Sequence, residues 1–458
     1  MFCYNITDSV NKSVRGDILK PNIIFYFSDQ QRADTLTPEI MPNLWALAEE
    51  GTRYTNSYTC QPVCGPARAC LQTGKYATQC GCYRNGIHLP ETEKTLADYF
   101  NENGYDTAYI GKWHLASELG NSDRHFHKKA VPKEFQGGYN YWRAADILEF
   151  TSHGYDGYVF DENGNQLDFT GYRADAINDF ALEYINKRTE EDKPFFMFVS
   201  QLEPHHQNDH KHFEGFQETI DSFKKHPIPS DLAFLKGNYK EEYPDYLSAI
   251  NRIDYNLGRL IDTLKEKGLY DNTVIIYTSD HGCHFKTRNS EYKRSCHESA
   301  IHTPLVIGGG AYKKGKVDDR LVSLIDLPPT MLQFADIYVP SFFSGISILE
   351  QEEKGIKREN VFIQISESQT GRAIRTKKYK YSVRALTFPH FYTGASSNVY
   401  YEDYLYDLDN DPDEKMNLVN DKNFKEIRKT LSKQLTDEME KAWELKPKIK
   451  PAIFKRKK

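Results

Sequence analysis

Short apolar runs alternate along the chain with longer segments in which apolar residues recur at helical spacing. The runs have the length and the β-branched and aromatic content of buried strands, and they cover residues 22–28, 106–110, 194–200, 273–279 and 304–307. Helical spacing is found at residues 44–50, 174–185 and 247–264. Strands that alternate with helices in this way predict an α/β fold with a doubly wound, mainly parallel sheet.

Particular residues indicate where some helices begin and end. Asn43 is a predicted N-cap for the helix at 44–50, and Gly51 is expected to end that helix. Pro66 favours the first position of a helix, so the preceding Cys64 is predicted to lie at a helix N-terminus.

The pattern changes beyond about residue 350. A charged connector at 350–360 is followed by strand-like segments at 361–366, 372–383 and 404–409, and a last helix is expected at roughly 421–443. We therefore predict two domains. Residues 1–350 form the larger α/β domain, and residues 351–458 form a smaller α+β subdomain with an antiparallel sheet, a helix and a basic tail.

Polar residues of the types used in catalysis follow four of the predicted strands. Open α/β sheets bind ligands at the carboxyl ends of their strands, so these side chains are expected at one edge. The residues, in chain order, are Asp29, Gln30, Lys112, His114, Glu203, His205, Asp280 and His281.

The segment that starts at Cys64 reads Cys-Gly-Pro-Ala-Arg and ends in Thr73-Gly74. A helix N-terminus stabilises an anion, and Arg68, one turn later, could hold a charged or polar group formed there. These residues alone leave two interpretations open. One is a capped helix with a buried thiol, and the other is a thiolate nucleophile of low pKa.

These motifs together resemble those of type I sulfatases, which belong to the alkaline phosphatase superfamily. Cys-x-Pro-x-Arg followed by Thr-Gly is similar to the signature in which the cysteine is oxidised to formylglycine. PNIIFYFSDQ, GKWHL, EPH, SDHG, YKRSCHESAIHTPLVI and LYDLDNDPDEKMNL resemble further family motifs, in the family's order, over roughly residues 21–420. The resemblance implies an alkaline-phosphatase-like fold and a sulfatase activity.

The resemblance also implies a site for one divalent cation. Its expected ligands are Asp29, Gln30, Asp280, His281 and the group made from Cys64. Calcium is the usual ion of the family. Many members have aspartate at the position of Gln30 and asparagine at the position of His281. With an imidazole among the ligands, manganese is also compatible with this ligand set. The pairs Asp29-Gln30 and Asp280-His281 resemble those of the family branch that contains choline sulfatases and phosphonate monoester hydrolases.

The catalytic roles implied by the resemblance fall on Cys64 and five other residues. Cys64 would supply the formylglycine hydrate that attacks sulfur. Arg68 would orient the hydrate, Lys112 would bridge it to a sulfate oxygen, and His114 would help to deprotonate it. His205 and Lys293 would protonate the leaving oxygen.

Three functions are compatible with these residues. The favoured one is hydrolysis of a sulfate ester, on a carbohydrate in preference to a small aryl or alkyl sulfate. The alternative is a phosphonate monoester or phosphodiester hydrolase that uses the same formylglycine. A third is a zinc-stabilised binding module without turnover, but the ligand spacing is irregular for such a site. Its residues would be His281, Cys283, His284, Cys296 and His297.

Substrate contacts are expected from basic side chains on loops, where no strict family motif applies. His302 stands where the family often has arginine, and a structural contact is the simpler interpretation of it. The candidates are Arg143, His206, His302 and Arg372, with His153, His210 and His390 as further ones.

Composition restricts the partners and the compartment. The net charge of −6 argues against bulk binding to nucleic acid, and no run of 18 apolar residues indicates a membrane span. The first twenty residues lack the apolar segment of a secretory signal, so a cytoplasmic location with free thiols is expected unless a signal was removed. The expected partners are a sulfated small molecule or oligosaccharide and a formylglycine-generating maturase. The oligomeric state is left open.

Overall fold

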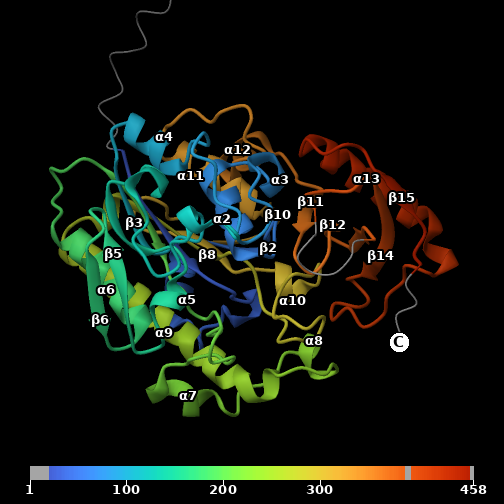
Figure 1. Ribbon diagram of the computed structural model, residues 1–458, viewed down its shortest axis with the longest axis horizontal. Helices are drawn as coiled ribbons and strands as arrows, with labels where there is room; N and C mark the ends of the chain where they lie inside the picture. Colours follow the sequence, from blue (N-terminus) through green and yellow to red (C-terminus); the bar gives the residue numbers. More distant parts are fainter. Residues whose placement is uncertain (1–19, 387–393, 454–458) are drawn as a thin grey trace, which may run out of the picture.

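The computed structural model describes residues 20–386 and 394–453, and a ten-stranded sheet forms its main body (Figure 1). The strand order is β10-β2-β9-β8-β1-β7-β3-β4-β5-β6. The bounds are β1 Asn22–Ser28, β2 Thr52–Tyr58, β3 Asp106–Lys112, β4 Tyr141–Ala145, β5 Asp156–Asp161, β6 Gln166–Thr170, β7 Phe195–Ser200, β8 Thr273–Ser279, β9 Leu305–Gly308 and β10 Lys316–Ser323.

Helices cover both faces of this sheet, which confirms the doubly wound prediction. Successive residues of β1 alternate between two hydrophobic clusters, one of which packs against α1, α6 and α9 and the other against α2, α4 and α11. The helix bounds are α1 Pro42–Glu50, α2 Cys64–Thr73, α3 Ala77–Cys80, α4 Leu96–Glu102, α5 Leu148–Thr151, α6 Arg173–Asn186, α7 Gln217–Phe223, α8 Ser230–Ala233, α9 Tyr239–Glu266, α10 Glu298–Ile301, α11 Leu327–Phe334, α12 Ile348–Lys354 and α13 Lys425–Lys441.

The central strands agree with the sequence prediction, and the margins of the sheet do not. The pairs β1–β7, β1–β8 and β3–β7 are parallel, as expected. β3 also pairs in parallel with β4, whereas β9 is antiparallel to both of its neighbours. Five strands were not predicted: β10 and β2 at one end of the sheet, and β4, β5 and β6 at the other. Each of them contains polar residues, so none is a continuous apolar run.

Two predicted helix starts need correction. Pro42 is the first residue of α1, so Asn43 lies inside the first turn and is not the N-cap. The backbone N–H groups of Asn43 and Leu44 donate to the Asp254 carboxylate of α9 at 3.0 and 2.7 Å. Cys64 opens α2 as expected, but Pro66 is its third residue and not its first.

A five-stranded sheet forms the C-terminal part, to one side of the main body (Figure 1). It is antiparallel except for the β14–β15 pair, and α13 packs on it where the last helix was predicted. The bounds are β11 Asn360–Ile365, β12 Gly371–Thr376, β13 Tyr379–Arg384, β14 Val399–Asp407 and β15 Lys448–Lys450. This architecture confirms the predicted fold class.

The two parts share hydrophobic packing. The ring of Tyr76 in the main body lies edge-on to Phe362 of β11, with centroids 5.2 Å apart, and a further cluster joins β10 to the second sheet. The helix α12 crosses residue 350. The domain boundary at 350 therefore stays a prediction.

The described cysteines are all buried and free, as expected, and Cys3 lies outside the described residues. None of the helices in the described part of the chain has both the length and the hydrophobicity needed to cross a bilayer. The cytoplasmic location stays a prediction.

Replacing Asp254 with alanine removes the acceptor at the start of α1. The free energy of unfolding is expected to fall by about 1–2 kcal/mol, the usual cost of a lost helix cap, as measured by denaturant titration. Asp262 is exposed on the same helix and gives a matched control, since Asp262→Ala is expected to change stability by less than about 0.5 kcal/mol. Equal stabilities of the two variants would contradict the capping role.

Candidate active site

The central strands of the large sheet end together at one edge. Ser28 pairs with Ser279, Phe27 with Ser200, and Ser200 in turn with Gly111. The residues that follow these strands therefore meet at this edge, as the sequence predicted. They include Asp29, Gln30, Lys112, His114, His205, Asp280 and His281, of which Gln30 and His114 turn the chain with φ of 72° and 62°.

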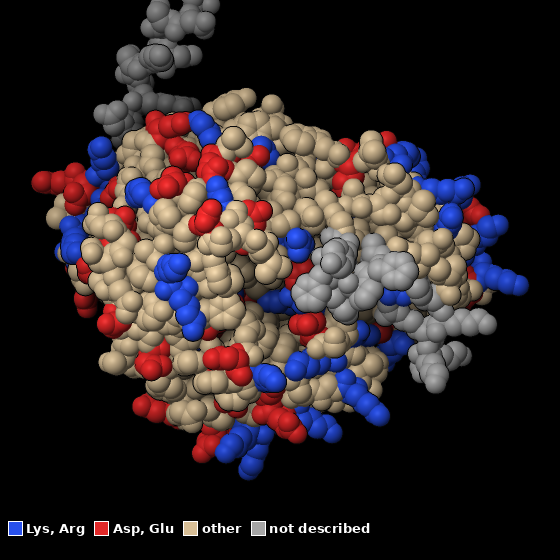
Figure 2. All heavy atoms as spheres, in the orientation of Figure 1, with Lys and Arg blue, Asp and Glu red and all other residues tan. Residues whose placement is uncertain are grey.

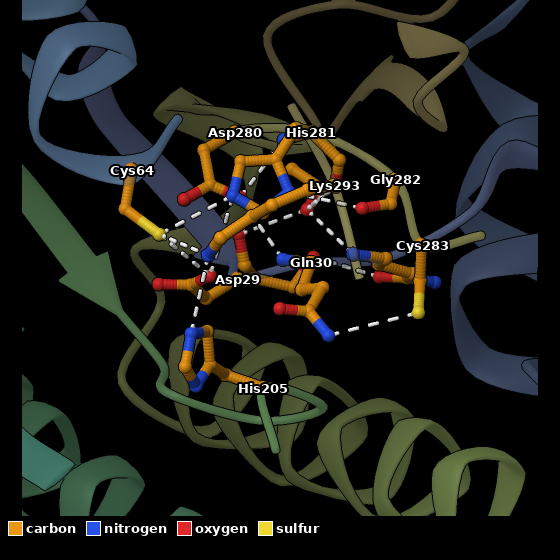
Figure 3. A network of polar contacts seen from close by, with 12 residues as sticks. Asp29, Gln30, Cys64, His205, Asp280, His281, Gly282, Cys283 and Lys293 are labelled. Atoms are coloured by element: carbon orange, nitrogen blue, oxygen red, sulfur yellow. Dashed lines mark hydrogen bonds and ion pairs between the residues drawn. The ribbon is translucent and has the colours of Figure 1, made fainter. Parts of the chain in front are cut away.

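Four buried residues at this edge form a group of potential metal ligands (Figure 3). One ligand atom from each of Asp29, Cys64, Asp280 and His281 lies within 4.8 Å of the others. The Cys64 thiol contacts Asp29 Oδ1 at 3.4 Å and His281 Nε2 at 3.2 Å. Because His281 Nδ1–H donates to the Gly282 carbonyl at 2.9 Å, its Nε2 carries the free lone pair and faces the group.

Two buried oxygens, one within this group and one on the residue after Asp29, have no hydrogen-bond partner among the described residues. They are Gln30 Oε1 and Asp280 Oδ2. The other amide atom of Gln30, Nε2, donates to Cys283 Sγ at 3.6 Å, which leaves the oxygen free. A buried polar atom without a partner costs about 1–3 kcal/mol, and a cation would relieve that cost. Carboxylate, amide and imidazole donors together fit a divalent ion.

Three cationic side chains surround the same carboxylate and thiol. Lys112 Nζ and Arg68 Nη2 donate to Asp29 Oδ2 at 2.9 and 3.0 Å, and Lys293 Nζ donates to Cys64 Sγ at 2.7 Å. Lys293 Nζ also lies 3.2 Å from His205 Nε2. Fixed positive charge around one reactive atom is the arrangement that stabilises a doubly or singly charged oxyanion during ester cleavage.

The pKa values of the carboxylates of Asp29 and Asp280 shift in opposite directions. Burial alone would raise the pKa of Asp29, but Lys112 and the other nearby cations outweigh it and hold that pKa well below its usual value. Burial and the negative charge of Asp29 raise the pKa of Asp280 to about 7. Asp280 therefore gains most from a cation that would keep it ionised.

The thiol of Cys64 is not activated. Burial, reinforced by Asp29, raises its pKa to about 12, despite the lysines nearby. A thiol with that pKa is neutral near pH 7, which argues against the low-pKa thiolate interpretation.

Both catalytic histidine candidates are held neutral. Burial, together with Lys293, lowers the pKa of His205 well below its usual value, and burial with Lys112 does the same for His114. His205 Nδ1–H donates to the His206 carbonyl at 2.6 Å, so its Nε2 is an acceptor directed at Lys293. Each imidazole can therefore accept a proton.

The sequence analysis missed three supporting residues. Glu149 Oε1 accepts from Lys112 Nζ at 3.2 Å, and Ser200 Oγ accepts from Arg68 Nη1 at 2.6 Å. Asp146 accepts from the backbone N–H groups of residues 115, 116 and 117 and holds the turn after β3. Asp146 and Glu149 follow β4, so recognising that strand would have placed both at the same sheet edge.

The residues proposed as substrate contacts have other partners. Arg143 pairs with Glu162 at 2.6 Å, and Arg372 is buried against Glu444 at 2.8 Å in the C-terminal part. The structure does not bring these two arginines to the metal-ligand group, because each guanidinium is committed to its carboxylate. His390 lies outside the described residues.

The histidine candidates contact other rings, and two of them also contact carboxylates. His206 stacks on His205 and packs against the tilted ring of Tyr292 at a centroid distance of 4.1 Å, so it lies next to the site. His302 stacks on Tyr58 and lies 3.0 Å from the Thr55 carbonyl, which agrees with a structural contact. His153 and His210 stack on each other, with centroids 4.4 Å apart, and lie 2.9 Å from Asp209 and 2.5 Å from Glu214, respectively.

The zinc-module alternative is wrong for this fold. The described residues gather only His281 of that set into a potential metal group. His284 Nε2–H donates to the Lys293 carbonyl at 2.9 Å, and Cys296 contacts Ser382 at 3.5 Å in the C-terminal sheet. The five side chains therefore do not form one group of metal ligands in the described part of the chain.

Comparison with known proteins identifies the family. The family model described as Sulfatase matches residues 21–337, and the one described as N-sulphoglucosamine sulphohydrolase, C-terminal, matches residues 290–441. The ulvan-active sulfatase of Formosa agariphila is 30% identical over 386 residues, which cover 79% of this chain and 73% of that protein. The N-acetylglucosamine-6-O-sulfatase of Bacteroides thetaiotaomicron is 26% identical over 512 residues, which cover 93% and 87%.

A solved structure has the same fold over almost the whole chain. The structure of BT4656 in complex with its substrate D-glucosamine-2-N,6-O-disulfate superposes with a TM-score of 0.77 and 23% identity, and it covers 93% of this chain and 98% of that one. The first family model alone spans more than half of the chain. The chain therefore belongs to the sulfatase family, within the alkaline phosphatase superfamily, and is a sulfuric ester hydrolase.

Proposed function

We propose that this enzyme hydrolyses the sulfate ester of a carbohydrate, with a formylglycine made from Cys64 and one divalent cation. The observation that carries the proposal is that Cys64 belongs to the group of potential metal ligands and also contacts Lys293. Lys112 and Arg68 contact the neighbouring Asp29 carboxylate. The sugar is supported by the names of the relatives above, which include an ulvan-active and an N-acetylglucosamine-6-O-sulfatase.

The cation would be held by Asp29, Gln30, Asp280 and His281, together with the Cys64-derived group. When bound, it would supply positive charge that stabilises the oxygens of the reacting sulfate. Calcium suits the oxygen donors, and the imidazole of His281 also suits manganese.

The Cys64-derived hydrate would supply two hydroxyls, one to attack sulfur and the other to lose a proton and expel sulfate. Arg68 is fixed for orienting this group, because its Nη1 donates to Ser200 Oγ and its Nη2 to Asp29. Lys112 keeps a full positive charge between Asp29 and Glu149 and would bind a sulfate oxygen. His114 is neutral, and its Nδ1 has no partner among the described residues, so it can accept the proton of the second hydroxyl.

Lys293 and His205 would act on the leaving-group side. The contact of Lys293 Nζ with Cys64 Sγ, at 2.7 Å, puts an ammonium group next to the reacting atoms. The 3.2 Å contact between Lys293 Nζ and His205 Nε2 lets the pair share a proton. Donation of that proton to the sugar oxygen would neutralise the leaving alkoxide.

Replacing Cys64 with alanine is expected to lower sulfate release by at least about a thousandfold, because no nucleophile can form. Peptide mass spectrometry on residues 54–68, after co-expression with a maturase, should show an aldehyde in place of the Cys64 sulfur in the wild type. Cys80→Ala, at a buried cysteine outside the signature, is the matched control and should keep both modification and activity. An unmodified, fully active wild type would contradict the formylglycine.

Replacing Asp280 with alanine is expected to remove both the bound metal and the activity, since it deletes a charged ligand. Elemental analysis of the purified protein measures the metal, and sulfate release measures the activity. Asp271→Ala, at an exposed aspartate just before β8, should retain one metal ion per chain. Normal metal content in Asp280→Ala would show that the cation binds elsewhere.

A pair of matched substrates distinguishes the sulfatase reaction from the alternative, hydrolysis of a phosphonate monoester. A sulfate monoester and a phosphonate monoester that share one leaving alcohol carry the same single charge, so their kcat/KM values compare the reactions directly. The matured enzyme is expected to prefer the sulfate ester. A preference for the phosphonate would favour the phosphonate monoester hydrolase.

A further inference from the structure

A pocket of about 500 Å³ opens beside the proposed active site. It lies within the size range of pockets for small ligands. Its lining includes His114, the loop 84–86, Leu119, residues of the segment 290–294, and Glu367 from the C-terminal part. Basic and acidic side chains intermix over the molecular face in Figure 2, which is hollowed near its centre.

The pocket adjoins the proposed catalytic residues. His114 forms part of its wall, and Arg294 follows Lys293, whose Nζ contacts Cys64. The loop 84–86, which also lines the pocket, is bonded to α2, the helix that begins at Cys64. Gly65 N–H donates to Asn85 Oδ1 at 2.9 Å. The pocket is therefore a candidate for the part of the substrate that extends beyond the sulfate.

Most charges in the pocket neutralise one another. The Arg294 guanidinium bridges Glu291, at 3.3 Å, and Glu367. The second oxygen of Glu367 accepts from the backbone N–H of Asn85 at 2.8 Å. These three charged side chains therefore form the fixed wall of the pocket and not a set of free binding groups.

Arg84 is different. Its side chain is half-buried in the same wall and has no hydrogen bond or ion pair with any of the residues that the structure describes. The next residue, Asn85, is tied on one side to Gly65 and on the other to Glu367, which fixes the backbone that carries the guanidinium. An unpaired arginine on an anchored loop is suited to bind an oxyanion with its planar fork.

We propose that Arg84 binds a second anionic group of the substrate, distinct from the sulfate that is hydrolysed. The inference rests on the proposed function, because it takes the scissile sulfate to lie at Cys64. The enzyme then selects saccharides that carry two anionic groups. The second group is an oxyanion that a guanidinium recognises, either another sulfate or the carboxylate of a neighbouring uronic acid.

Binding is measured by calorimetry in the Cys64→Ala background, which cannot turn over the probes. The probes are glucosamine 6-sulfate, glucosamine 2-N,6-O-disulfate, and the 6-sulfate joined to a uronic acid. Arg84→Gln is expected to weaken binding of at least one dianionic probe by roughly 10- to 100-fold, as for loss of a charge-assisted hydrogen bond, and that of the monosulfate by less than about threefold. The dianionic probe that responds identifies the second group.

Two further variants test the specificity of the effect. Arg84→Lys keeps the charge but not the fork and should recover part of the affinity. Arg53→Gln changes a half-buried arginine on β2 that stacks on Trp45 outside the pocket, and it should leave all three affinities unchanged. Two results would overturn the inference. One is an equal weakening of all three probes by Arg84→Gln, and the other is that the Cys64→Ala protein with Arg84 intact binds neither dianionic probe. Failure of the proposed function is seen separately, as absence of sulfate release by the matured enzyme.

Discussion

The Asp29 carboxylate is the interaction on which the rest of the site depends. Its Oδ1 faces the Cys64 thiol, and its Oδ2 accepts from Lys112 and Arg68. It lies in the interior, where an unpaired charge is very costly, so each neighbour must keep its partner. The carboxylate therefore fixes Cys64 relative to the cationic side chains of Lys112 and Arg68.

That arrangement needs support from a wider set of residues. Glu149 and Asp29 together hold the Lys112 ammonium, while Ser200 and the Lys112 carbonyl hold the Arg68 guanidinium. These contacts fix the orientation of the cations before any substrate arrives. Preorganised charge stabilises a transition state without the cost of reorienting dipoles during the reaction. The same contacts explain why burial of so many charges is tolerated here.

The C-terminal sheet belongs to the same functional unit as the large sheet. Glu367, in the connection from β11 to β12, contacts Asn85 and Arg294 and thereby reaches both the loop near the nucleophile helix and the segment that carries Lys293. Hydrophobic packing joins the two parts beneath these contacts. Loss of this sheet would remove a wall of the pocket and leave Arg294 without one of its carboxylate partners.

The sequence by itself determined the central strands, because strands buried on both faces must be continuously apolar, and it located the polar residues that follow them. It also supported the family through its motifs. Tertiary structure decided which polar groups find partners. Asp254 from α9, and not Asn43, caps α1; Arg372 is neutralised by Glu444; and Arg84 has no partner among the described residues. Such pairings join residues far apart in the chain, so no local pattern of hydrophobicity or charge encodes them.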